Sequence, residues 1–396
     1  MKLERNLGLE PIELVRMGNT GMVGPMGDTQ AFLNSKLRQN IAFAAYFEPK
    51  TIEEIAKELN VSVAFVEDEV LYLEEYGFLD LMPGQRYRTN IYIDCVPFEI
   101  VQQAREMELQ VARLICDEYI PEVIALARDY SKEEIYVPED DLNYFLWTLI
   151  PRAVTEHIAV TVNFDMLRRN NYMVKRKDGG EFVALATLYQ KEVEELTAKE
   201  YMCGPMSLEK SDVPMYSWSL STLFEDREHG WQVNKTEDYV NLIWYIKVGL
   251  PKTEAVLDKY IRLYERGLLR QGDDSINVVV VKEDKEKGLF AQVARQDAGE
   301  DIEVDRAGAL RKYIPKMSET LLKKIETLAE DKVKLQKEYM PEHMHKLVEV
   351  YGRAKHINTV MIMDELLKRG TLKPLTDAQK RGVMVVVYSD TLPEEG

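Results

Sequence analysis

The chain has 396 residues, 45% of them hydrophobic and 30% charged, a composition that excludes a disordered chain. The net charge of −17 excludes a protein that coats nucleic acid through its overall charge. The sequence shows no apolar run of the secretory type near its start, no apolar stretch of membrane-spanning length and no closely paired cysteines, so we expect a cytoplasmic protein without a membrane partner.

The charge is distributed unevenly along the chain. Residues 306–382 contain 17 Lys and Arg against 10 Asp and Glu, whereas the residues before them are strongly acidic. Because phosphate contacts come from Lys and Arg, this basic C-terminal segment is where the sequence most favours contact with nucleic acid.

Residues 1–30 contain glycines at regular spacing, namely Gly18, Gly21, Gly24 and Gly27. A phosphate-binding loop would also need a preceding strand and a Lys-Ser or Lys-Thr pair, and neither is evident in the sequence. We therefore expect a looped lead-in over this segment.

The segment 31–95 has the pattern of a compact helical domain that ends in a hairpin. Thr51 and Glu54 form a capping-box pattern, and Asn60 suits a left-handed turn. Gly77 is placed to end the last helix. The expected helices are 34–47, 52–59 and 63–76, and the expected strands are 78–81 and 87–93.

The stretch TIEEIAKELNVSVAFVEDEVLYLEEYGFL in this segment resembles the winged helix-turn-helix transcriptional regulators, and the resemblance extends over residues 32–93. It implies that the helix after the turn enters the major groove of DNA and that the hairpin, or wing, contacts the backbone. The DNA-binding residues it implies are Ser62, Ala64, Phe65, Arg86 and Arg88.

The charge of that helix disagrees with this role. It carries no base, and its acids are Glu67, Asp68, Glu69, Glu74 and Glu75. Such a face repels phosphates and gains nothing from counterion release. Protein contact is therefore the alternative use of the module, as an interaction domain that acts on the transcription machinery.

The segment 96–235 is expected to form a central α+β domain. Helices are predicted over 97–128 and 141–167, a hairpin over 172–189 and a third strand over 216–224, giving a small antiparallel sheet. Its aromatic residues either pack in the core or line a pocket for a small-molecule effector. The ligand-binding candidates are Tyr216, Trp218 and Trp231.

The end of the segment 31–95 has a fixed order of elements, namely a helix, a glycine, two apolar residues, a polar turn and a strand. This order recurs in 236–300 and again in 301–396. The anchoring glycines are Gly77, Gly267 and Gly370. We expect two further winged-helix-like modules, the last one basic, with residues 373–381 as a hairpin tip. Their DNA-binding candidates are Lys252, Lys259, Arg262, Arg266, Lys373, Lys380 and Arg381, and the alternative is that these bases only solvate the surface.

A long amphipathic helix is predicted over 318–340, packed either on its own domain or in the seam of a homodimer. His343 and His345 would point in different directions on a helix, so no metal site is expected there. No catalytic or dinucleotide-binding motif is evident in the sequence, so no catalytic residue or cofactor is expected.

Together these patterns predict a helix-rich α+β protein that binds DNA as a transcriptional regulator of the bacterial type. A central domain would sense a ligand or partner. The alternatives are the protein-interaction module and an enzyme built on the aromatic central domain.

Overall fold

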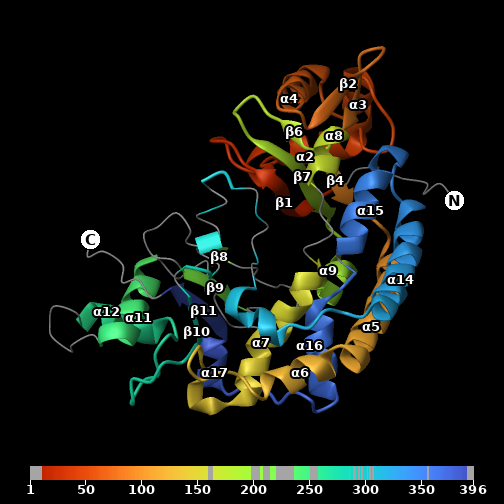
Figure 1. The fold of residues 1–396 in the computed structure, drawn as a ribbon. Helices are drawn as coiled ribbons and strands as arrows, with labels where there is room; N and C mark the ends of the chain where they lie inside the picture. Colours follow the sequence, from red (N-terminus) through yellow and green to blue (C-terminus); the bar gives the residue numbers. More distant parts are fainter. Residues whose placement is uncertain are drawn as a thin grey trace. The chain divides into compact units, whose positions relative to one another are not determined.

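The computed structural model describes residues 11–158, 164–197, 206–207, 215–219, 236–249, 257–284, 286–288, 291–292, 298–300, 307–354 and 356–389, with the single residues 295, 302 and 305. The fold is α+β, as expected from the sequence (Figure 1). The chain forms two compact units. Unit 1 contains residues 1–107, 160–197 and 326–356, and unit 2 contains residues 108–159, 198–325 and 357–396. Neither unit is one continuous stretch, and the division into five continuous domains stays a prediction.

Unit 1 includes the module that the sequence predicts most clearly. It follows α1 (Thr29–Phe32) and contains α2 (Lys36–Ala44), α3 (Ile52–Leu59) and α4 (Val63–Glu75), followed by the hairpin of β2 (Leu79–Met82) and β3 (Arg86–Thr89). The Thr51–Glu54 capping box forms, and Asn60 has a φ of 54°. Gly77 has a φ of 71°. The helices, the turn and the hairpin thus follow one another in the order expected from the sequence. We call α2, α3, α4 and the β2–β3 hairpin the N-terminal module.

The module packs on a sheet with strand order β1-β7-β4, in which β6 also pairs with β7. The strands are β1 (Leu14–Met22), β4 (Tyr92–Asp94), β6 (Val174–Lys175) and β7 (Glu181–Leu188). The expectation of a loop over residues 1–30 is wrong for β1, which pairs antiparallel with β7. The periodicity of β1 is hidden by its glycines, and its pairing partner lies more than 150 residues away.

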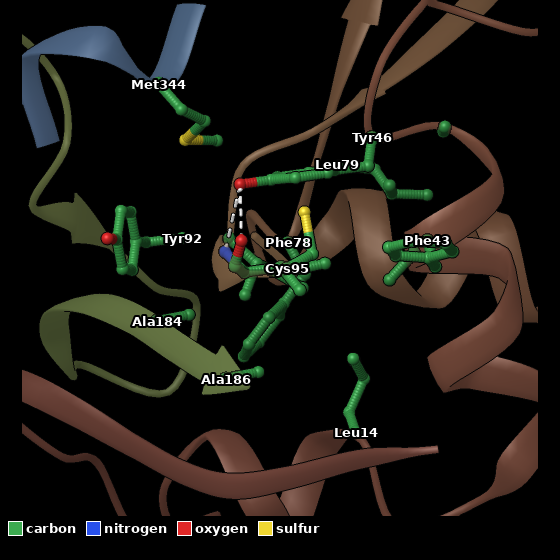
Figure 2. Packing of buried hydrophobic residues seen from close by; sticks show 14 of the residues in the cluster. Leu14, Phe43, Tyr46, Phe78, Leu79, Tyr92, Cys95, Ala184, Ala186 and Met344 are labelled. Carbon is green, nitrogen blue, oxygen red and sulfur yellow. Dashed lines mark hydrogen bonds between the residues drawn. The ribbon is translucent and has the colours of Figure 1, made fainter. Parts of the chain in front are cut away.

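The core of unit 1 joins these elements (Figure 2). Phe43, Phe78 and Tyr92 are buried together with Ala184 of β7. The buried hydroxyl of Tyr46 donates to the carbonyl of Ile93 at 2.9 Å. Unit 1 also contains α8 (Phe164–Arg169), α9 (Lys191–Thr197), η5 (Glu342–Met344) and α15 (His345–Ala354). The N-terminal module is thus part of a larger core and not an isolated domain.

Unit 2 combines helices with a second sheet of order β5-β10-β11-β9-β8. Its strands are β5 (Ile135–Tyr136), β8 (Met206–Ser207), β9 (Met215–Ser219), β10 (Val279–Glu283) and β11 (Met384–Ser389). Its helices include α6 (Ile120–Ala127), η1 (Pro138–Asp140), α7 (Leu142–Ile158), α11 (Thr236–Val248), α12 (Leu257–Glu265), η4 (Gly308–Tyr313), α16 (Thr359–Lys368) and α17 (Asp377–Gly382). The boundary between the residues of the two units falls within α5 (Phe98–Glu118) and within α14 (Glu319–Lys337).

The predicted central sheet does not form. The 172–189 hairpin exists as β6 and β7, but its other partners are β1 and β4. The strand predicted at 216–224 is β9, and it pairs with β11 and β8 in the other sheet. These strands pair with partners that lie far away in the sequence. Local residue patterns predict that a strand forms but do not reveal which strand it pairs with.

The predicted hairpin tip at 373–381 is also wrong. Its second half is the short helix α17, which begins with a capping box formed by Thr376 and Gln379. The strand after this helix, β11, pairs parallel with β10 and antiparallel with β9, and not with a strand directly before it. A Thr-x-x-Gln pattern, which is a capping box in the sequence itself, is the local reason for the helix.

The three glycine-anchored helix ends have the same backbone geometry. Gly77, Gly267 and Gly370 have φ values of 71°, 69° and 70°. In each case the residue after the glycine donates its N–H to the residue four positions before the glycine, at 2.8–2.9 Å. Those three acceptors are the buried residues Leu73, Leu263 and Leu366.

The N-terminal module and the α11–α12 segment also share the backbone pairing beyond the glycine. Asn90 donates its N–H to the carbonyl of Phe78, and Asn277 donates to Leu268, both at 2.9 Å. Leu269 and Ile276 then form an antiparallel bridge. The recurring frame that the sequence suggests is therefore present in two copies up to the hairpin, and in the third copy only up to the end of the helix.

Candidate interaction surface

Helix α4 buries one side and exposes the other. Val66, Val70 and Leu73 are fully buried because their spacing of four and three residues places them on one face. Ser62 precedes α4 and its side chain makes no capping hydrogen bond, and the helix ends before Gly77. The side opposite the buried residues therefore faces solvent, from a helix whose orientation is fixed by the core.

The exposed side of α4 mixes apolar and acidic side chains. Phe65 is 70% exposed and Leu71 46% exposed. Ala64, Asp68 and Leu71 succeed one another at helical spacing on the face opposite the core. We define the α4 surface as Val61, Ala64, Phe65, Glu67, Asp68 and Leu71, all of which are exposed.

The acids of α4 differ in their partners. Glu69 pairs with Arg38 at 2.5 Å, and Glu75 pairs with Lys177. Glu67 and Asp68 form no ion pair with any residue that the structure describes. The α4 surface therefore presents two uncompensated negative charges beside exposed apolar side chains.

The two arginines predicted to contact DNA from the hairpin are bound to carboxylates. Arg86 donates to both carboxylate oxygens of Glu54 and to the carbonyl of Pro49, each at 2.8 Å. Arg88 pairs with Asp80 at 3.2 Å. The backbone N–H of Thr51, and then Arg86, hold the pKa of Glu54 below its usual value, so this carboxylate stays charged. Both arginines thus have their charge matched within the module.

A buried arginine that the sequence did not indicate fixes the end of α4. Arg176 is 3% exposed. Its guanidinium carbon lies 4.0 Å from the ring centroid of Phe78 and 3.8 Å from that of Phe182. It also donates to the backbone carbonyls of Tyr76 and Phe182. It therefore links the C-terminal end of α4 to β7.

The DNA-binding candidates around α12 differ in their contacts and exposure. Arg262 donates to both carboxylate oxygens of the fully buried Asp238, at 2.6 Å each. This pairing raises the pKa of Arg262 and makes it a structural residue. Lys259 is half-buried on the same helix, and Arg266 is half-buried in the turn directly after it. Lys252 lies outside the described residues.

The C-terminal candidates lie on a loop and on α17. Lys373 is exposed, and its backbone accepts hydrogen bonds from Asn143 and Trp147. Lys380 pairs with Asp377 at 3.2 Å. Arg381 is exposed and lies against Gly267, where an added Cβ would be 2.7 Å from the backbone oxygen of Arg381. These bases therefore do not form the wing that the sequence suggested.

The ligand-binding candidates are only partly placed. Tyr216 and Trp218 lie on β9, opposite Val387 and Val385 of β11. Their side chains, and all of Trp231, lie outside what the structure describes. The effector pocket therefore stays a prediction.

The histidine cluster has structural contacts. The ring of His343 bonds to the carbonyl of Thr89, and that of His345 to the carbonyl of Met340, both at 3.1 Å. Burial lowers the pKa of His343. Within the described part of the chain, no three His, Cys, Asp or Glu side chains converge as metal ligands. In the same residues, every helix is too short or too polar to cross a bilayer.

Comparison of the chain with protein-family models, curated proteins and solved structures finds no match. The interpretation of function therefore depends on the geometry and charge of these surfaces.

Proposed function

We propose that the chain is a non-enzymatic regulator whose N-terminal module is a winged helix-turn-helix domain that binds protein rather than DNA. The order of helices, the left-handed Asn60 and the hairpin after Gly77 support the winged-helix assignment. The matching geometry around Gly267 supports a second, shorter module of the same type.

The observation that carries the protein-binding role is the composition of the α4 surface. Phosphate contacts need Lys, Arg or hydrogen-bond donors on the helix that enters the groove. The α4 surface offers Glu67 and Asp68 instead, and Arg86 of the hairpin is paired with Glu54. Exposed Phe65 and Leu71 are typical of protein contacts, because interface cores are enriched in aromatic and apolar side chains.

The test is the fluorescence anisotropy of labelled duplex DNA with the full chain at low salt. We expect Phe65→Ser and the double variant Arg86→Ala/Arg88→Ala to leave any DNA affinity unchanged. Replacing both Glu67 and Asp68 with Lys should increase that affinity, because like-charge repulsion is removed. Loss of DNA binding in Phe65→Ser or in the arginine double variant would show that the module reads DNA after all.

A second candidate function is DNA binding through the C-terminal bases. Lys373 is exposed and forms no ion pair within the described residues, and Arg381 is exposed as well. Lys373→Glu combined with Arg381→Glu should abolish DNA retention if these bases hold the backbone. The matched control is Lys346→Glu, an exposed lysine on α15 in the other unit.

Two further roles stay predictions: an effector pocket around Trp218 and a partner from the transcription machinery.

A further inference from the structure

We propose that the α4 surface binds a basic, amphipathic helical segment of a partner protein. This inference rests on the proposed protein-binding function and specifies the chemistry of the partner. It depends on three properties of the surface: its apolar residues, its unpaired acids and its rigid support.

The apolar residues define the contact area. Phe65 and Leu71 lie on either side of Asp68, and Val61 extends the area beyond the N-terminal end of the helix. A helical segment covers such a row with apolar side chains at i, i+3 or i+4 and i+7. An extended strand would instead need an open sheet edge, which α4 does not provide.

The acids define the charge of the partner. Glu67 and Asp68 lie next to Leu71 and Phe65 and have no ion-pair partner among the described residues. A partner with Lys or Arg beside its apolar row matches these charges, whereas duplex DNA, an anionic membrane surface and an acidic protein are repelled. Charge complementarity therefore selects a basic protein segment among the macromolecules that an apolar surface attracts.

The support of α4 keeps this surface in place. Val66, Val70 and Leu73 anchor the helix from below, and Arg176 holds its C-terminal end against β7. Phe65 therefore does not need to be ordered by the partner, which reduces the entropy cost of binding.

The test is the fluorescence anisotropy of a labelled helical peptide of about 18 residues. The peptide consists of Leu and Lys, with Leu at helical spacing, and a matched peptide carries Glu in place of Lys. We expect the full chain to bind the Lys peptide and not the Glu peptide. Phe65→Ser, and separately Glu67→Lys with Asp68→Lys, should each weaken binding by about tenfold or more.

The matched controls are Leu322→Ser, an exposed leucine on α14, and Glu106→Lys, an exposed acid on α5. Both should leave the affinity unchanged, and circular dichroism should show that every variant is folded. If the controls weaken binding as much as the α4 variants do, the peptide adheres to the acidic chain in general and the inference fails.

Other results separate this inference from the proposed function. If both peptides bind equally and Phe65→Ser abolishes binding of both, the protein-binding role survives and the basic partner is wrong. If light scattering shows a dimer that Phe65→Ser converts to a monomer, the occupant is a second copy of the chain and the inference is overturned. If DNA binding depends on Phe65, the proposed function itself is wrong.

Discussion

Arg176 provides the sharpest test of how α4 is held. Burial lowers the pKa of its guanidinium to about 10, with Asp178 partly opposing the effect. A lowered pKa in a cation means that the folded state disfavours the charged form. At about 1.4 kcal/mol per pH unit, keeping the charge costs roughly 3 kcal/mol at neutral pH. This cost disappears only when the pH exceeds the pKa of Arg176 in the unfolded chain. It is therefore measured by substituting Arg176 and not by varying the pH.

The contacts of Arg176 must exceed this cost. Two cation–π contacts contribute about 1 kcal/mol each, and two charged hydrogen bonds about 1.5 kcal/mol each. Arg176→Met loses these contacts, removes the desolvation cost and keeps an apolar chain between the rings, so we expect a net destabilisation of about 2 kcal/mol. Arg176→Ala also leaves a void between Phe78 and Phe182, which adds about 2 kcal/mol.

Urea unfolding followed by far-ultraviolet circular dichroism at pH 7 measures both variants. The expected order of stability is wild type, then Met, then Ala, with similar dependence on urea. An Ala variant as stable as the Met variant would mean that the space between the rings closes without cost. A change below about 0.5 kcal/mol in both would refute the role of Arg176 in holding α4.

Three further predictions concern stability. Arg262→Ala should destabilise unit 2 by about 3–5 kcal/mol in urea unfolding, because it leaves the carboxylate of Asp238 buried without its arginine; an unchanged midpoint would contradict this. Gly267→Ala should lower the melting temperature more than Gly370→Ala, since both have positive φ but only the first would place a Cβ against Arg381; equal losses would contradict the contact. Burial, reinforced by Lys332, lowers the pKa of His356 to about 3, so its contribution to stability is complete above pH 6.5 and falls as the pH drops below that value. Between pH 7 and pH 5 the wild type should lose about 2 kcal/mol of stability through this histidine, and His356→Leu should not show that part of the loss. An unaltered pH profile in the variant would refute the role of His356.

The sequence by itself determined the N-terminal module. Its helices, its turn at Asn60 and its end at Gly77 depend on neighbours within a few residues, namely a capping box, a left-handed position and an apolar spacing of three and four. The acidity of α4 is likewise a property of the sequence. These local features were enough to predict the order of elements in the module and the absence of bases on α4.

Only the tertiary structure shows which charged side chains form ion pairs and which strands pair with each other. Arg86 and Arg88 look like DNA contacts in the sequence, but the fold brings Glu54 and Asp80 to them. β1 becomes a strand because β7 pairs with it across more than 150 residues. Such partners are set by chain topology, and residue spacing cannot reveal them. The same holds for the α4 surface, where the packing of Val66, Val70 and Leu73 determines that Phe65 and Leu71 stay in solvent.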